Sequence, residues 1–193
     1  MFSTEAFNLY LKGIELYNAG DMNNAILALS EAVQMEPTMA QAFLTRGTAW
    51  WKLMDEERAL DDFNTAISLR KDYVEAHSSR ASLHIHMYRY DDAIDDYDFI
   101  MRLHPDLISE GLYRGYAHLQ VKNYVQCIAD VSRFIDKVKD NAYAYCWRGK
   151  AYSCTGNMDG AIADFDRALE IDPEYEEVLF ERQVAVAIKG HPL

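Results

Sequence analysis

The most regular polar feature of the sequence is a series of basic residues that recur at one fixed interval. Its members are Lys12, Arg46, Arg80, Arg114, Arg148 and Arg182. A row of positive charges could bind an acidic partner. However, an acidic series has the same spacing, and arginine forms bidentate bonds with carboxylates in partly buried pairs. That acidic series consists of Asp62, Asp96, Asp130 and Asp164. We therefore expect the two series to pair inside the protein.

The order of the two series predicts which residues pair. The basic series continues to Arg182, beyond the last acidic member, so each aspartate is expected to bridge to the next arginine along the chain. The predicted pairs are Asp62–Arg80, Asp96–Arg114, Asp130–Arg148 and Asp164–Arg182.

An acidic run and two histidines are the candidates for metal binding. The run from Asp91 to Asp98 lacks the Asp-x-Asp-x-Asp-Gly order of a calcium loop. Carboxylates at the start of a helix are favoured by its dipole, which explains the run without a cation. His84 and His86 are two positions apart, which places them on different faces of a helix. We predict no metal site.

The three cysteines have no pattern that indicates a metal site or a disulfide. Cys146 and Cys154 would lie about 12 Å apart along one helix, which is too far for a disulfide. With Cys127 they are interpreted as reduced, mostly packed thiols of a cytosolic protein. The sequence also lacks a nucleophile–base pair, a phosphate-binding glycine loop and a zinc pattern. We therefore predict that the protein is not an enzyme and needs no cofactor.

The elements that carry these residues form a repeat. Pro37, Pro105 and Pro173 are evenly spaced, at twice the interval of the basic series. In each copy, a small residue lies in the middle of a helical pattern, at a constant distance before the proline or the position that corresponds to it. These small residues are Gly13, Gly47, Ala81, Gly115 and Gly149. Glycine costs a helix about 1 kcal/mol relative to alanine, so its recurrence indicates close packing of a second helix.

Each copy therefore consists of two antiparallel helices of roughly 13 residues joined by a tight turn. In four of the turns, a side-chain oxygen could cap the start of the second helix. The third copy lacks a capping residue at this point, and Asp91 and Asp92, which follow closely, could take this role. The four turns are Gly20-Asp21, Met54-Asp55, Lys122-Asn123 and Gly156-Asn157.

These motifs resemble the tetratricopeptide repeat, a helical hairpin of about 34 residues. The second copy shows the pattern in Phe43-Gly47-Trp50 and Ala59-Phe63-Ala66. The fifth copy shows it in Tyr145-Gly149-Tyr152 and Ala161-Phe165-Ala168-Pro173. The resemblance implies an all-α, right-handed solenoid of five hairpins that forms one array over residues 1–193. The repeats are expected at about 6–39, 40–73, 74–107, 108–141 and 142–175.

Two parts of the array depart from the family pattern. The fourth copy has Gly111, Cys127 and Lys139 where the pattern expects other residue types, which predicts locally looser or re-angled packing. Residues 176–190 resemble one more first helix, but its central residue is Gln183 instead of glycine or alanine. We interpret this segment as the terminal helix that covers the last face of a repeat array.

The resemblance also indicates where a partner would bind, because the first helices of such arrays line a concave face. Beside the stripe that packs inward, a second stripe lies about 100° away on each first helix. The groove residues predicted from it are Tyr10, Ile14, Tyr17, Leu44, Thr48, Trp51, Lys52, Ile85, His86, Leu112, Tyr116, Leu119, Tyr143 and Lys150.

One subgroup of the family clamps the acidic C-terminal tails of chaperones with lysine, arginine and asparagine. The matching positions here hold Tyr10, Ile14, Thr45, Glu75 and Ser79, so the carboxylate clamp is absent.

Composition limits the classes of partner. The 193 residues carry a net charge of −12, which disfavours nucleic acid and anionic membrane surfaces. No basic-then-apolar leader opens the sequence, and no apolar run approaches the length that a membrane span needs. A cytoplasmic location is therefore expected.

The most favoured function is a non-catalytic adaptor or scaffold for protein–protein interaction. Its concave groove would bind a peptide or helix that has apolar or aromatic anchors. Two alternatives remain: a scaffold that assembles with copies of itself through its end helices, and a helical repeat that binds nucleic acid, which the charge disfavours.

Overall fold

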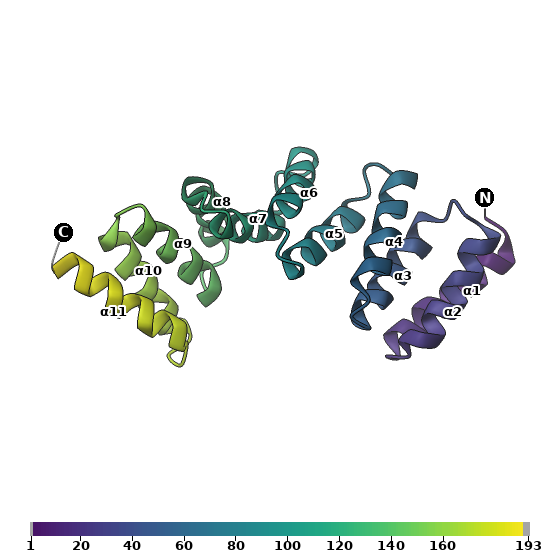
Figure 1. Cartoon of the computed structure of the whole chain (residues 1–193), viewed down its shortest axis with the longest axis horizontal. Helices are drawn as coiled ribbons and strands as arrows, with labels where there is room; N and C mark the ends of the chain where they lie inside the picture. The colour runs from purple at the N-terminus through teal and green to yellow at the C-terminus, as the bar shows by residue number, and fades with distance from the viewer. Residues whose placement is uncertain (1, 191–193) are drawn as a thin grey trace. The chain divides into compact units, whose positions relative to one another are not determined.

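The computed structural model describes residues 2–190, and this part of the chain is helical with no strand. Eleven helices lie within it. They are α1 (Thr4–Asn18), α2 (Met22–Met35), α3 (Ala40–Lys52), α4 (Glu56–Leu69), α5 (Val74–His86), α6 (Tyr90–Leu103), α7 (Ile108–Gln120), α8 (Tyr124–Lys137), α9 (Ala142–Cys154), α10 (Met158–Ile171) and α11 (Glu176–Gly190) (Figure 1).

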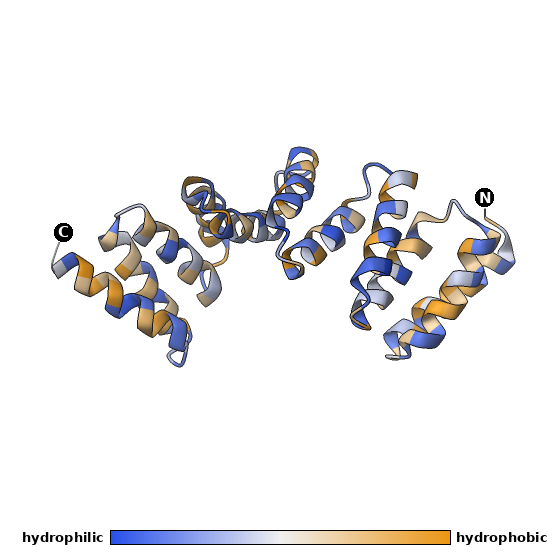
Figure 2. Ribbon diagram, in the orientation of Figure 1, coloured by the Kyte–Doolittle hydropathy of each residue, from blue (hydrophilic) through white to orange (hydrophobic). Residues whose placement is uncertain are grey.

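Each helix forms because its apolar residues recur with the helical period. In α4, Ala59, Phe63 and Ala66 are spaced by four and then three positions, and all three are fully buried. The intervening residues are mostly polar or charged, so hydrophobic and hydrophilic residues alternate along the ribbon (Figure 2). The helix is therefore stabilised mainly by packing of its apolar face.

The predicted glycine column is confirmed as the place where paired helices approach each other. A Cβ atom at Gly47 would lie 2.8 Å from the Phe63 ring, and one at Gly149 would lie 2.7 Å from the Phe165 ring. No side chain fits at such distances without movement of the neighbouring ring or helix. Consecutive helices α1/α2, α3/α4, α7/α8 and α9/α10 therefore form close antiparallel hairpins (Figure 1).

The five turns inside the repeats share one backbone conformation that the sequence only partly indicated. Gly20 and Gly156 have φ of 83° and 84°, the left-handed region that glycine tolerates. Met54, Tyr88 and Lys122 adopt the same region with φ of 61°, 59° and 62°. Because a side chain makes this conformation unfavourable, packing of the flanking helices must stabilise the left-handed backbone in these three turns.

Of the four predicted cap residues, three are confirmed and one is wrong. The side chains of Asp21, Asp55 and Asn157 accept the backbone N–H three positions later. Asn123 makes no such bond at the start of α8. Helix α6 begins after Arg89, whose side chain makes no cap bond, and Asp91 and Asp92 lie in the first turn of this helix.

The chain divides into two compact units, residues 1–88 with α1–α5 and residues 89–193 with α6–α11. The boundary falls inside the third copy. In the second unit, a continuous core runs from Leu112 on α7 to Ala185 on α11. In the first unit, smaller clusters form around Leu29 and Phe63.

The all-α fold class is confirmed, and the helix order agrees with five hairpins followed by a cap helix. Helix α11 packs on α10 and α9, and Gln183 is exposed, in agreement with the interpretation of this segment as a cap helix. The single array over residues 1–193 stays a prediction. Within residues 2–190, no helix combines the length and the apolar character needed to cross a bilayer.

Candidate binding surfaces on the first helices

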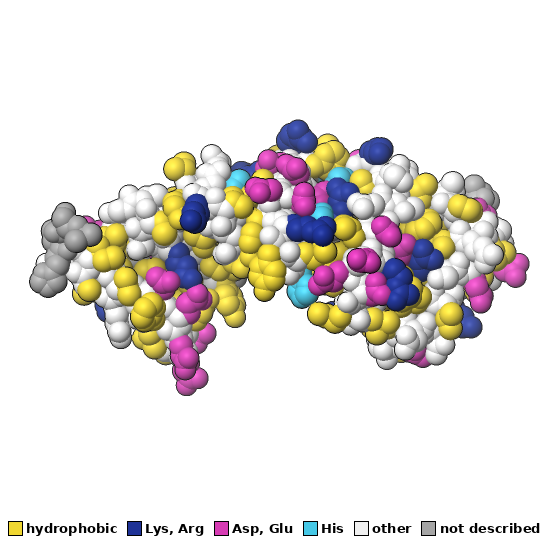
Figure 3. Space-filling view, viewed as in Figure 1, with side chains coloured by type: hydrophobic (Ala, Val, Ile, Leu, Met, Phe, Trp, Pro, Cys, Tyr) yellow, Lys and Arg dark blue, Asp and Glu magenta, His cyan; other side chains and the backbone are white. Residues whose placement is uncertain are grey.

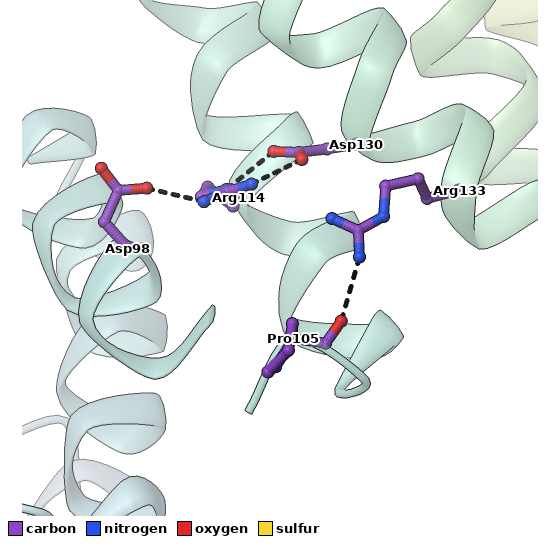
Figure 4. A network of polar contacts seen from close by, with 5 residues as sticks. All are labelled: Asp98, Pro105, Arg114, Asp130 and Arg133. Atoms are coloured by element: carbon purple, nitrogen blue, oxygen red, sulfur yellow. Dashed lines mark hydrogen bonds and ion pairs between the residues drawn. The ribbon is translucent and has the colours of Figure 1, made fainter. Parts of the chain in front are cut away.

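Four arginines of the series, Arg46, Arg114, Arg148 and Arg182, form ion pairs within the protein, as predicted, but the predicted partners are wrong. Arg114 binds both carboxylate oxygens of Asp130, at 2.7 Å from Nε and 2.6 Å from Nη2 (Figure 4). Arg148 binds Asp164 in the same bidentate way, at 2.8 and 2.7 Å.

Arg46 repeats the arrangement with Asp62. Each of these arginines therefore pairs 16 positions ahead, inside its own hairpin, and not with the aspartate of the preceding copy.

A different residue bridges to the preceding copy, 16 positions before the arginine. Within the first unit, Arg46 Nη1 donates to Ser30 at 3.1 Å and Arg80 Nη1 donates to Asn64 at 2.6 Å. Within the second unit, Arg114 Nη1 donates to Asp98 at 2.7 Å, and Arg148 Nη1 donates to Ser132 at 3.1 Å. These bonds tie adjacent repeats together.

The same geometry explains why the basic series continues to the cap helix. Arg182 on α11 keeps the partner 16 positions earlier and pairs with Asp166. The predicted Asp164–Arg182 pair is wrong because Asp164 is already bound by Arg148.

This pairing removes the arginines from the list of ligand-binding candidates. The side chains of Arg114 and Asp130 are 16% and 4% exposed. The hydrogen bond to Asp130 raises the pKa of the Arg114 guanidinium, and Asp164 has the same effect on Arg148. On the molecular face shown in Figure 3, lysine and arginine side chains are likewise interspersed with acidic ones.

The other candidates for chemistry have structural positions. His84 is buried, whereas His86 is exposed, so the prediction that they face different directions is confirmed. Burial raises the pKa of the Cys127 thiol to about 12 and that of Cys146 to about 11, so both are protonated packing residues. Cys154 is exposed, unlike the other two cysteines.

No group of three or more histidine, cysteine or acidic side chains among residues 2–190 is arranged to hold a metal ion.

In the first unit, the predicted groove residues are half-buried, except for Lys52 and His86, which are exposed. The half-buried residues are Tyr10, Ile14, Tyr17, Leu44, Thr48, Trp51 and Ile85. The Trp51 ring lies 6.3 Å from the His86 ring, and His86 Nδ1 is 2.8 Å from a carboxylate oxygen of Glu56. Trp51, Lys52 and Met54 line a shallow pocket of about 230 Å³.

In the second unit, the predicted residues divide into buried and accessible ones. Leu112 is only 5% exposed and belongs to the core. Tyr116 and Leu119 are half-buried, and Tyr143 is 59% exposed. Lys150 forms ion pairs with Glu177 and Glu181 of α11. Burial alone would lower the pKa of the Lys150 ammonium, but the hydrogen bond with Glu177 raises it, and the net pKa is raised.

The structure adds a row of aromatic rings that sequence reasoning did not identify. The Tyr116 ring lies 4.6 Å from Trp147, which lies 6.3 Å from Tyr143, which lies 5.4 Å from Tyr175. Tyr90 on α6 extends the row, 6.3 Å from Tyr116. We call these five residues the aromatic row.

Trp147 was missed because the predicted stripe passed through the preceding position. At that position, Leu112 and Cys146 point into the core, whereas the next residue, Tyr113 on α7 or Trp147 on α9, is half-buried or exposed. A step of one residue rotates the side chain by about 100°. The available signal was the presence of large aromatic residues at that next position in two successive copies.

The rings of the aromatic row do not stack face to face. They are tilted or edge-on to one another, so each leaves part of a face or edge for another group. Its polar neighbours, Lys150 and Glu177, are paired with each other.

Comparisons with known proteins agree with this fold. Tetratricopeptide repeat models match residues 10–74 and 142–175, which together make up about half of the chain. The chain belongs to the tetratricopeptide repeat family. Members of this family are in general protein-interaction modules, and the protein is a repeat scaffold of this class.

Solved structures of tetratricopeptide repeat proteins are similar over most of the chain. A repeat protein from Parabacteroides merdae is 19% identical with a TM-score of 0.83, covering 97% of this chain and 75% of that one. MamA from Desulfovibrio magneticus RS-1, from its residue 41 onward, is 15% identical with a TM-score of 0.83, covering 91% and 99%.

YrrB, described as a repeat protein with an unusual peptide-binding site, is 17% identical with a TM-score of 0.76, covering 86% and 85%. At these identities the similarity extends to the fold alone. No curated protein matches the sequence.

Proposed function

We propose that the protein is a non-catalytic adaptor that binds a segment of a partner protein through its first helices. The observation that carries the proposal is the aromatic row of the second unit. Four of its rings, those of Tyr116, Trp147, Tyr143 and Tyr175, form an unbroken series of ring contacts.

The physical chemistry of the aromatic row favours an apolar or aromatic anchor. Tyrosine and tryptophan bury large areas on binding and lose little side-chain entropy, because they have only two rotatable angles. Tyr143 is 59% exposed and the other rings are half-buried, so they are held by neighbours but still accessible. A pre-ordered surface of this kind lowers the cost of association.

A second contact region is proposed in the first unit, around Trp51. Its ring, Lys52 and Met54 line the shallow pocket of about 230 Å³. The proposal includes one continuous array over residues 1–193. The peptide-binding site named for YrrB is a precedent for such binding on this fold.

The test is partner capture by crosslinking and mass spectrometry with matched variants. Tyr143→Ala and Trp147→Ala are expected to lose specific partners that the wild type retains. Phe180→Ala on α11, which removes a ring that is 66% exposed but outside the aromatic row, should retain them. Loss of the same partners in all three variants would contradict a site at the aromatic row.

Once a partner segment is identified, titration of that peptide measures the contribution of the first unit. Trp51→Ala is expected to weaken binding by about 2 kcal/mol or more with unchanged helicity, because aromatic anchors dominate binding energy. Unchanged affinity would confine binding to the second unit.

Self-assembly is the second candidate, because the cap helix has an exposed apolar face. Leu179, Phe180, Val186 and Ile188 of α11 are 41%, 66%, 44% and 42% exposed. Light scattering after size exclusion tests it: a concentration-dependent oligomer in the wild type that Phe180→Glu abolishes would support it. A monomer at all concentrations would exclude it.

A further inference from the structure

A pocket of about 380 Å³ opens on the second unit, away from the aromatic row. Its lining residues come from three helices: Asp98, Met101 and Arg102 from α6, Arg114 from α7 and Arg133 from α8. Three of the five are arginines, in a protein whose net charge is −12.

The sequence of the fourth copy explains why this region is open. Gly111 occupies a position at which every other copy, and the cap helix, has a larger side chain. The equivalent residues are Leu9, Phe43, His77, Tyr145 and Leu179. A Cβ atom at Gly111 would have only Met101 nearby, 3.5 Å away, and a small recess lined by Gly111, Met101 and Arg133 adjoins the main pocket. The predicted looser packing of the fourth copy is found at this point.

The charges of the pocket are not balanced. Arg114 binds Asp130 with two nitrogens and Asp98 with the third, so both carboxylates share one guanidinium (Figure 4). Arg133 donates to the backbone carbonyl of Pro105 at 3.0 Å, a bond that orients the guanidinium but neutralises no charge. The Arg102 guanidinium lies 5.9 Å from the centre of the Phe99 ring.

Among residues 2–190, no carboxylate forms an ion pair with Arg102 or Arg133.

The planar guanidinium group binds carboxylate and phosphate oxygens through parallel N–H donors. Arg133 uses one nitrogen on Pro105 and is held facing the pocket, while Arg102 borders it from α6. We infer that this pocket binds an oxyanion, a carboxylate or phosphate group carried by a side chain of a partner protein. The inference does not depend on the aromatic row, because it rests on a different set of residues.

The chain provides a matched control for the test. Arg167 occupies in the fifth copy the position that Arg133 has in the fourth. Its guanidinium is already paired with Asp140 at 3.0 Å and Glu170 at 2.8 Å. Arg133→Gln and Arg167→Gln therefore change the net charge equally at equivalent positions of the repeat, but only the first removes a pocket donor.

The experiment is an NMR titration of the full chain with inorganic phosphate and, separately, with acetate, at low and matched ionic strength. The Nε–H signals of Arg102 and Arg133 and the amide of Gly111 are expected to shift saturably in the wild type and in Arg167→Gln. Arg133→Gln and Arg102→Gln should each weaken binding by about tenfold or more, the effect of losing one charge-assisted contact.

Two results would overturn the inference. One is a shift that rises linearly without saturation, and the other is equal weakening in Arg133→Gln and Arg167→Gln, since both indicate general charge screening. The two probes also distinguish the source of the oxyanion: saturable binding of phosphate alone supports a phosphorylated partner side chain, and saturable binding of acetate supports an aspartate or glutamate. Thermal melts of each variant show that it is folded.

Discussion

Two glycines four positions apart on α7 should respond in opposite directions to the same substitution. Gly111 and Gly115 both lie inside the helix, where glycine is about 1 kcal/mol less favourable than alanine. A Cβ atom at Gly111 would lie 3.5 Å from Met101 Cε, an ordinary contact with the end of a flexible side chain. We therefore expect Gly111→Ala to stabilise the protein by about 0.5–1 kcal/mol.

At Gly115 the same methyl group has no room. Its Cβ would lie 2.8 Å from Val131 Cγ2 and 3.3 Å from Asp130 Cβ. Val131 is fully buried, and a β-branched side chain in a helix has one strongly preferred rotamer, so it cannot turn away. Overpacking costs about 1–3 kcal/mol, which exceeds the gain in helix propensity. After about 1 kcal/mol of gained helix propensity is subtracted, we expect Gly115→Ala to destabilise the protein by up to about 2 kcal/mol.

Urea unfolding, monitored by far-UV circular dichroism, gives the free energy of unfolding of both variants and of the wild type. Because repeat proteins can unfold in more than one step, the transition that involves the second unit should be compared in all three chains. A change of the same sign in both variants would refute the claim that Gly115 is retained for close packing whereas Gly111 borders open space.

The remaining predictions concern a buried ion pair, a buried histidine and a strained turn. Arg114→Ala should lower the free energy of unfolding in urea by about 2–4 kcal/mol, because it leaves the buried Asp130 carboxylate without its bidentate partner. A negligible loss would mean that water replaces the guanidinium. Burial lowers the pKa of His118, whose Nδ1 has no hydrogen-bond partner. The neutral His118 ring therefore makes its full contribution to the free energy of unfolding above the pKa of about 6.5 that histidine has in the unfolded chain. This contribution is lost as the pH falls from there through the lower pKa of the folded state. The free energy of unfolding should decrease from about pH 8 to pH 5 in the wild type and decrease less in His118→Gln. Equal decreases in the two proteins would exclude His118 as the cause. Lys122→Gly should stabilise the protein by about 1 kcal/mol, because Lys122 has a φ of 62°, and thermal melts that show no gain would indicate that the turn is not strained.

The sequence by itself determined the secondary structure and the repeat, because both depend on local periodicity. The small residues at Gly47, Gly115 and Gly149 predicted where helices approach, and each has a neighbouring side chain within 3.0 Å of the Cβ position. The cap helix over residues 176–190 followed from Gln183 in place of a small residue. These features recur at the same interval in successive copies, so the copies support each other.

The tertiary structure decided which side chains meet. Arg114 could pair with an aspartate ahead or behind, since the basic and acidic series have the same spacing. Only the packing of α7 against α8 and α6 assigns Asp130 and Asp98 as its partners. The aromatic row depended on helix rotation: a difference of one residue, about 100°, turns Leu112 inward and brings Trp147 beside Tyr116.

The pocket beside Gly111 also exists only in three dimensions, because its lining combines residues from three helices. Periodicity defines the faces of a single helix, but it contains no information on the rotation of one helix against its neighbours, which the packing of the core determines.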